Sequence, residues 1–162
     1  MPENSKKMTN LRQIARPQVV VLAYDGLCTF EFGVAVEIFG LPRPELGDEW
    51  YRFAVASVDY GELRATGGIR IVTDGDLSLL ASADLIVVPG WRGIDSPVPD
   101  ALCEALRQAS ARGCQLLSIC SGVFVLAATG LLNGRKATTH WRYIDGLKVR
   151  YPDIDVVEDV LY

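Results

Sequence analysis

The chain reads Leu116-Leu117-Ser118-Ile119-Cys120-Ser121-Gly122-Val123-Phe124-Val125-Leu126 at the point that decides its fold. An apolar run typical of a strand passes directly into a helical run, and Cys120 stands at the corner. A residue on such a turn projects from the carboxyl edge of a sheet, the arrangement called a nucleophile elbow. Gly122 lets the helix pack close to the strand, and the free amides of its first turn favour a thiolate. The stretch predicts a reactive Cys120, with an inert buried cysteine as the alternative.

Short β-rich runs alternate with helical patterns on both sides of this stretch. The strands we expect are Gln18 to Tyr24, Tyr51 to Val58, Asp84 to Val88 and Gln115 to Ile119, with a short hairpin or edge strand at Ile69 to Val72. The helices we expect are Phe30 to about Leu41 capped by Thr29, a brief one capped by Asp76, Pro99 to Arg112, Ser121 to Thr129 and Arg142 to Tyr151. This alternation is typical of a parallel sheet covered on both faces, so we expect an α/β fold.

The composition limits the function classes. A length of 162 residues with 49% hydrophobic residues fits one domain with a substantial core. The net charge of -4 argues against a basic nucleic-acid-binding surface. Residues 1–16 are polar and lack the apolar core of a signal peptide, and no run approaches the roughly 20 apolar residues of a membrane span. We therefore expect a flexible segment at 1–16, one domain at 17–162, a cytoplasmic location and no membrane contact.

The cysteines do not form a metal-binding pattern. The chain has four of them, and they lack the paired short spacings of a zinc site. The single histidine, His140, adds no cluster. Cys114 lies six residues before Cys120, about 20 Å away in an extended strand, so the two cannot form a disulfide. We expect reduced thiols, no metal and no cofactor.

Three loops should converge at the carboxyl ends of the strands, where ligands bind in open parallel sheets. They are residues 25–31, 89–93 and 120–122. The catalytic candidates are Cys120, which offers sulfur, and Glu31, which offers a carboxyl group or is an ordinary acid at a helix start. The amides near Gly90 to Trp91 and of Ser121 are candidates for an oxyanion hole. The ligand-binding candidates are Gly90, Trp91, Ser121 and Asp25.

Five motifs together carry a family resemblance. They are Tyr24-Asp25-Gly26, Thr29-Phe30-Glu31-Phe32-Gly33, Val87-Val88-Pro89-Gly90-Trp91, Ser118-Ile119-Cys120-Ser121-Gly122 and Ala137-Thr138-Thr139-His140-Trp141. The chain resembles the PfpI-like branch of the class I glutamine amidotransferase-like superfamily. More closely, it is similar to the amino-terminal domain of AraC-family transcriptional regulators of the GlxA and FtrA type. The resemblance implies a flavodoxin-like three-layer sandwich, usually dimeric, with Cys120 and Glu31 at the family's cysteine and acid positions.

Two departures from the family pattern bear on function. PfpI-type proteases carry histidine directly after the nucleophile, where this chain has Ser121. His140 lies twenty residues after Cys120 and is better explained by local packing beside Trp141, which weakens peptidase or amidase chemistry. Regulators of this type also continue through a further strand, a helix and a DNA-binding domain with two helix-turn-helix motifs, none of which follows Tyr162.

These observations favour a regulatory domain over an enzyme. We expect a ligand-sensing or dimerising domain of an AraC-type regulator, truncated before its DNA-binding domain, that binds an unknown small-molecule effector, forms a homodimer and meets DNA only through the missing part. The alternative is a cysteine-dependent enzyme resembling isonitrile hydratase, in which Cys120 attacks an electrophilic carbon and Glu31 shuttles protons. A third possibility is a binding module with an inert thiol.

Overall fold

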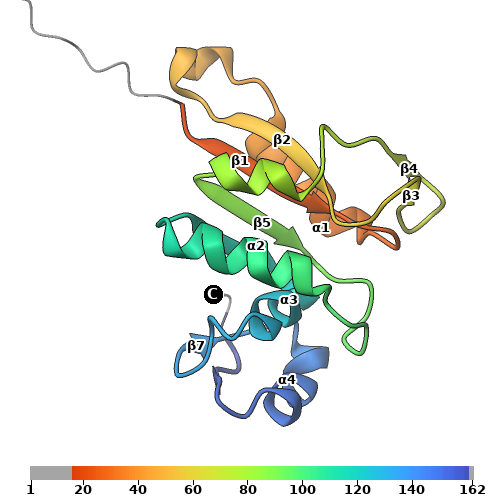
Figure 1. Ribbon diagram of the computed structural model, residues 1–162, viewed down its shortest axis with the longest axis vertical. Helices are drawn as coiled ribbons and strands as arrows, with labels where there is room; N and C mark the ends of the chain where they lie inside the picture. The colour runs from red at the N-terminus through yellow and green to blue at the C-terminus, as the bar shows by residue number, and fades with distance from the viewer. Residues whose placement is uncertain (1–15, 161–162) are drawn as a thin grey trace, which may run out of the picture.

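A four-stranded parallel sheet forms the centre of the domain (Figure 1). The computed structural model describes residues 16–160, so the segment expected at 1–16 lies outside the described residues except for Arg16. The strands are β1 (Gln18–Ala23), β2 (Arg52–Ser57), β5 (Leu85–Pro89) and β6 (Gln115–Ile119). They lie in the order β2-β1-β5-β6 with every neighbouring pair parallel, which confirms the predicted parallel α/β sheet.

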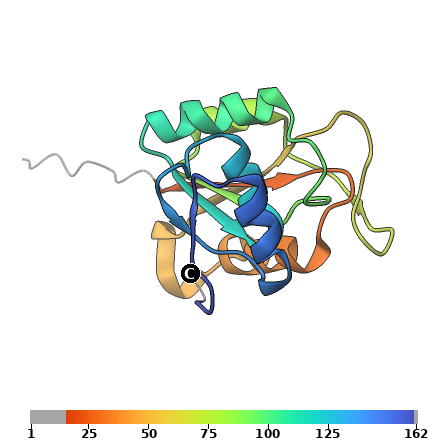
Figure 2. The ribbon, with the colours of Figure 1, turned by 90° about the horizontal axis from the view of Figure 1, so that it is seen from below.

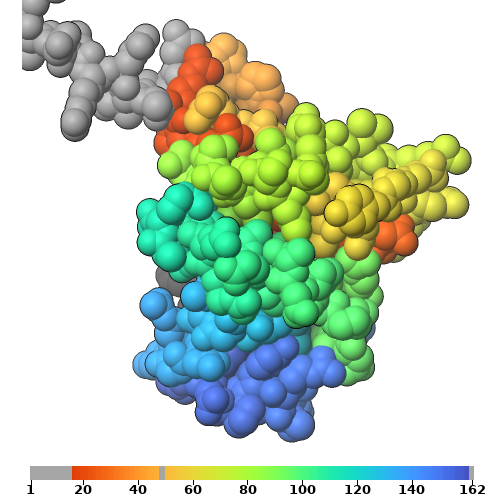
Figure 3. Space-filling model, viewed as in Figure 1, coloured from red at the N-terminus to blue at the C-terminus, as the bar shows by residue number. Residues whose placement is uncertain are grey.

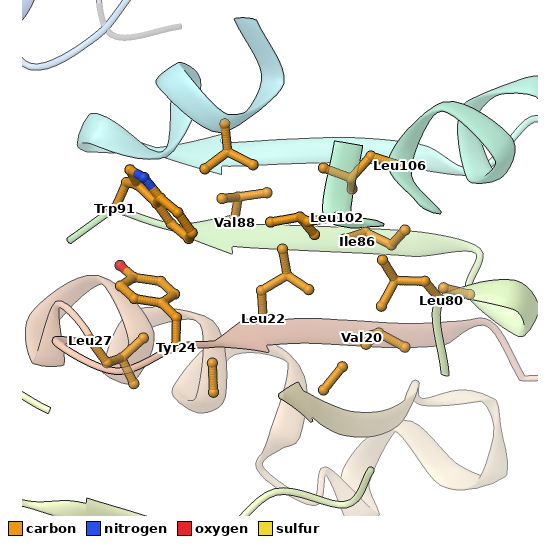
Figure 4. Packing of buried hydrophobic residues seen from close by; sticks show 14 of the residues in the cluster. Val20, Leu22, Tyr24, Leu27, Leu80, Ile86, Val88, Trp91, Leu102 and Leu106 are labelled. Atoms are coloured by element: carbon orange, nitrogen blue, oxygen red, sulfur yellow. The ribbon is translucent and has the colours of Figure 1, made fainter. Parts of the chain in front are cut away.

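Helices cover both faces of the sheet (Figure 2). On one face α2 (Asp100–Ala111) buries Leu102 and Leu106 against Val20 and Leu22 of β1, and Figure 4 shows these side chains in one cluster. On the other face Val19 and Val21 pack with the helix α1 (Thr29–Ala35). Because alternate residues of β1 point to opposite faces and both faces are covered, β1 reads as a continuous apolar run. The predicted three-layer sandwich is thereby confirmed.

The smaller elements complete the layers and connect them. They are the π-helical turn η1 (Val36–Gly40), the 3-10 turns η2 (Pro44–Glu49), η3 (Leu77–Ser82), η4 (Cys120–Gly122) and η5 (Trp141–Tyr143), the helices α3 (Val123–Ala128) and α4 (Ile144–Arg150), and the strands β3 (Leu63–Arg64), β4 (Arg70–Ile71), β7 (Lys136–Ala137) and β8 (Asp155–Val156). The β3–β4 hairpin and the Asp76 cap of η3 are as predicted. Within residues 16–160, no helix has the length and apolar character needed to cross a bilayer.

The first crossover differs from its prediction. The expected continuous helix ends at Ala35 and continues as η1. Thr29 does not cap α1, because the N-cap residue is Cys28 and the Thr29 hydroxyl instead donates to the carbonyl of Thr66 at 2.8 Å. This long-range bond holds the crossover against the segment that follows β3, so tertiary contact has overridden the local capping preference.

The last third of the chain forms one end of the molecule. Figure 3 shows the blue residues gathered opposite the red and orange ones. A second hydrophobic cluster joins α3 to α4 through Phe124 and Leu147. The two-residue strands β7 and β8 pair in parallel beside it and were not predicted from the sequence, because two residues are too few for a period-2 pattern. This end of the fold supplies one wall of the cavity beside Cys120.

Candidate functional site

Cys120 stands on a strained turn between β6 and η4. Its φ is +55°, a left-handed conformation that is uncommon for a residue with a side chain and costs on the order of 1–2 kcal/mol. The surroundings hold it there. The Thr139 hydroxyl donates to the Cys120 carbonyl at 2.8 Å, and the Gly90 amide donates to the Ile119 carbonyl at 3.0 Å. The backbone therefore has the sharp strand-to-helix geometry that the sequence predicts.

Gly122 makes this turn possible. A Cβ added there would overlap the carbonyl oxygen of Val88 and lie 3.1 Å from the amide nitrogen of Gly90. The start of the helix thus rests directly on the backbone of β5, which is the close packing expected from the glycine.

Glu31 and Cys120 meet at the carboxyl edge of the sheet, although 89 residues separate them in the sequence. Burial raises the pKa of the Cys120 thiol, the amide of Ser121 at the sulfur lowers it, and the charge and hydrogen bonding of Glu31 raise it again. The overall direction is upward. The expectation that helix-start amides favour a thiolate is wrong as a net effect, because burial and the carboxylate outweigh the single amide. At neutral pH the sulfur is held mainly as a thiol.

The loop after β5 approaches the site but does not form the expected oxyanion hole. Gly90 has a φ of +75°, and its amide is used by the carbonyl of Ile119. The Trp91 amide donates to the Ser121 hydroxyl at 2.9 Å. Both donors are already satisfied within the fold, so neither is free for a substrate. Of the three amides expected to form the oxyanion hole, it is the Ser121 amide that hydrogen-bonds with the Cys120 sulfur.

None of the four ligand-binding candidates is among the residues that line the cavity beside Cys120. Trp91 is only 3% exposed, and its ring packs on that of Tyr24 with centroids 4.9 Å apart, as Figure 4 shows. Asp25 is exposed, and its carboxylate accepts from the Arg64 amide at 3.0 Å. Both residues therefore stabilise the loops around the site. Arg92 of the same loop forms an ion pair with Asp59 at 2.8 Å.

A cavity of about 710 Å³ opens beside Cys120. Its volume is in the range of small-molecule sites. The lining residues come from the end of β6 with the turn after it and from residues 138–160. They are Ser118, Ile119, Cys120, Thr138, Thr139, His140, Trp141, Ile144, Asp145, Glu158, Asp159 and Val160. Within it, Nδ1 of His140 accepts from the Arg142 amide at 3.3 Å, and its ring stacks beside Trp141. His140 thus caps the start of η5, the structural role that local packing suggested.

The sequence interpretation missed Cys28 and Tyr24. The Cys28 thiol donates to the Trp91 carbonyl at 3.6 Å, and the Tyr24 hydroxyl donates to the Pro89 carbonyl at 2.8 Å. Burial raises the pKa of Tyr24, and a hydrogen bond with Cys28 raises it further. The spacing Cys28-x-x-Glu31 was a usable signal, because residues three apart share one face of a helix.

The fold and the site define a parallel α/β domain whose cysteine, on a strand-to-helix turn, faces a carboxylate from the first crossover. The chain belongs to the DJ-1/PfpI family, whose model matches residues 17–160. An uncharacterized protein in the cpoL 5' region of Streptomyces lividans is 35% identical over 136 residues, covering 83% of this chain and 95% of that protein.

Regulators and an enzyme are both among the relatives. The HTH-type transcriptional regulator CdhR of Pseudomonas aeruginosa is 39% identical over 111 residues, which is 68% of this chain and 33% of the regulator. The isonitrile hydratase of Pseudomonas putida is 41% identical over 63 residues, or 38% of this chain and 28% of the enzyme. A solved AraC family transcriptional regulator from Pseudomonas putida shares the fold with a TM-score of 0.70 at 22% identity, covering 88% of this chain and 76% of that one. The chain is therefore homologous to the DJ-1/PfpI-type domain of AraC-type regulators and spans about a third of CdhR.

The raised pKa of Cys120 predicts slow alkylation that accelerates with pH. The rate should rise through an inflection above the ordinary thiol value of about 8.5. Glu31→Gln removes a charge and a hydrogen bond that both raise this pKa, so labelling of Cys120 by iodoacetamide at pH 7 should become several times faster. Mass spectrometry of the labelled peptide measures the rate.

The exposed Glu37→Gln variant is the matched control and should label at the wild-type rate. Slower labelling of Glu31→Gln would contradict the electrostatic account and indicate that Glu31 activates the thiol as a base.

Proposed function

We propose that this domain is the effector-binding and dimerising module of an AraC-type transcriptional regulator. One observation carries the proposal: a cavity of metabolite size borders Cys120, while the pKa of that thiol is shifted away from nucleophilic activation. A binding site needs shape and polar partners and does not need a thiolate. Similarity to CdhR supports the regulatory role.

The effector would bind against Cys120, Thr138 and Trp141 at the end of β6. These residues come from the turn η4 directly after β6 and from the segment that leads into η5, so a ligand between them would couple the end of the sheet to the segment before α4. In this proposal DNA contact belongs to a different part of the regulator, since this domain carries a net charge of -4. A cytoplasmic location follows from the same role.

Dimerisation is assigned to the outer face of α1 and η1. Phe30 is 78% exposed and Ile38 47% exposed on this face. They border an apolar groove together with Gly33, whose added Cβ would meet no atom within 4 Å. Phe30 is a projecting ring and Gly33 an open depression one turn further on, so a second copy related by a two-fold axis can place each ring over the other's glycine. The occupant we propose is therefore a second copy of this chain.

Phe30→Asp should shift the protein from dimer to monomer. The ring would anchor the interface twice, once from each copy, and a buried aromatic anchor is worth about 2 kcal/mol or more. The dissociation constant should rise at least roughly 30-fold, as measured by analytical ultracentrifugation. Tyr60→Asp is the control, because Tyr60 is another exposed aromatic residue but lies outside this groove. Equal dissociation constants for the two variants would contradict the assignment.

A thermal-shift survey of small metabolites tests the effector site. A true effector raises Tm with a saturable dependence on concentration, because it binds the folded state alone. We expect Cys120→Ser to change the affinity and Cys114→Ser to leave it unchanged, since Cys114 packs at the other end of β6. If no metabolite changes either Tm or the dimer equilibrium, the effector-binding role is refuted.

A second candidate function is supported by the contact between Glu31 and Cys120. In a cysteine-dependent hydratase the thiol would attack an electrophilic carbon while Glu31 takes its proton and returns it to the adduct. The similarity to isonitrile hydratase agrees with this role. Turnover of isonitriles, abolished by Cys120→Ala and retained in Cys114→Ala, would establish the enzyme. No turnover by the wild-type protein is the result that the regulatory role predicts.

A further inference from the structure

The site contains two thiols, and the proposed effector-binding function uses only one of them. Cys28 and Cys120 are both partly exposed and free, and they lie on two of the three loops that converge at the carboxyl edge of the sheet. Cys103 is buried in α2, and Cys114 precedes β6 at the opposite end of that strand. The four cysteines therefore divide into a pair at the site and two that are remote from it.

The backbone of Gly90 and Trp91 touches Cys28 on one side and both neighbours of Cys120 on the other. The Cys28 sulfur bonds to the Trp91 carbonyl, and an added Cβ on Gly90 would lie 2.8 Å from that sulfur. The amides of the same two residues bond to the Ile119 carbonyl and the Ser121 hydroxyl. The two thiols therefore flank the same two-residue segment.

Electrostatics agree with this placement. Cys28 is among the groups that raise the pKa of Cys120, and it also raises that of Tyr24, so its sulfur lies within the field of both side chains. Glu31 lies one helical turn after Cys28 and reaches Cys120. The Glu31 carboxylate therefore lies at the same edge of the sheet as both sulfurs.

The absence of a side chain at Gly90 leaves room for the sulfurs to approach. A Cβ there would also lie 3.3 Å from the Tyr24 hydroxyl, so alanine would crowd the space next to Cys28. A thiol is a weak donor, so the 3.6 Å hydrogen bond from Cys28 to the Trp91 carbonyl costs little to break. Disulfide formation requires the two sulfurs to come within about 2.05 Å, which side-chain rotation and a shift at the start of α1 would have to supply.

We propose that Cys28 is the resolving thiol for Cys120, and that a peroxide converts the pair into an intrachain disulfide. In the first step the Cys120 thiol loses its proton to solvent, the thiolate attacks one peroxide oxygen, and the O–O bond breaks to give a sulfenic acid and hydroxide, which takes up a proton as water. In the second step the Cys28 sulfur attacks the Cys120 sulfur, the S–O bond breaks, and the leaving hydroxide takes the Cys28 proton. Two thiols and one peroxide thus yield one disulfide and two waters.

The consequence for the molecule is a covalent link between the first crossover and the turn after β6. Cys28 is the N-cap residue of α1, whose outer face carries Phe30 and the groove assigned above to the dimer. Drawing Cys28 toward Cys120 would move the start of that helix. Oxidation of Cys120 would therefore displace the proposed dimer surface, because Phe30 follows Cys28 by two residues.

The test treats the full chain with two equivalents of hydrogen peroxide, the amount that sulfinic acid formation at one cysteine consumes, at pH 7 and at pH 8.5, followed by blocking of free thiols and peptide mapping by mass spectrometry. We expect a peptide pair linked through Cys28 and Cys120, two free thiols in place of four, and faster formation at the higher pH. Cys28→Ser should give no linked pair and should accumulate Cys120 sulfinic acid, a mass gain of two oxygens. Cys103→Ser and Cys114→Ser should form the link as the wild type does.

A wild-type protein in which Cys120 is overoxidised at the Cys28→Ser rate, with Cys28 still free, would overturn the proposal. A link between any other pair of cysteines would do the same. Circular dichroism of the reduced Cys28→Ser protein establishes that it is folded before the comparison. Effector binding and dimerisation of the reduced wild-type protein are measured separately, so the regulatory role and the disulfide can fail independently.

Discussion

Gly122→Ala should lower the free energy of unfolding by about 3 kcal/mol and disturb the Cys120 turn. The added methyl group would overlap the Val88 carbonyl oxygen and press on the Gly90 amide, and both obstacles are backbone that cannot rotate away. Either η4 lifts from β5 or β5 bends. In both cases the Gly90–Ile119 hydrogen bond that fixes the residue before Cys120 is stretched. Urea unfolding measures the stability, and iodoacetamide labelling measures the exposure of Cys120.

Gly33→Ala is the matched control for this substitution. Gly33 lies in α1, and its added Cβ would meet no atom within 4 Å, so alanine should stabilise the monomer by about 0.5–1 kcal/mol through its higher helix propensity. The two glycine-to-alanine substitutions should thus change the free energy of unfolding in opposite directions. A Gly122→Ala protein as stable as the wild type would show that the helix start does not rest on β5.

Phe124→Ala should be still more destabilising, by about 3–5 kcal/mol. The ring is buried and packs with Leu147 and Ile154, which joins α3 to α4. Truncation leaves a cavity in a small cluster that has few neighbours available to collapse into it. Because α4 and η5 carry one wall of the cavity beside Cys120, loss of this packing should also loosen that wall and accelerate Cys120 labelling.

Val149→Ala is the control for Phe124→Ala. Val149 lies on α4, the helix that Phe124 packs against, but is exposed, so its truncation should change stability by less than about 0.5 kcal/mol. Thermal and urea unfolding of both variants give the comparison. Equal free energies of unfolding for Phe124→Ala and Val149→Ala would mean that the second hydrophobic cluster contributes little to the stability of the fold.

The sequence predicted the parallel sheet and its covering helices because these elements depend on local patterns. Continuous apolar runs separated by helical periods require a parallel sheet with both faces covered, and the bounds of β6 agree with those read from the sequence. The placement of Cys120 on a strand-to-helix turn followed from the apolar run that ends at Ile119 and the helical run that begins after Gly122. Convergence of the loops followed from the rule that parallel strands present their carboxyl ends at one edge.

The chemistry of the site was decided by tertiary structure. The pKa of Cys120 depends on how deeply the sulfur is buried and on Glu31, and the amides of Gly90 and Trp91 are consumed by partners about 30 residues later in the chain. Cys28 entered the site only because its loop folds against the end of β5. Periodicity and spacing describe one segment at a time, whereas desolvation, hydrogen-bond occupancy and charge at a site are sums over segments that meet only in the folded chain.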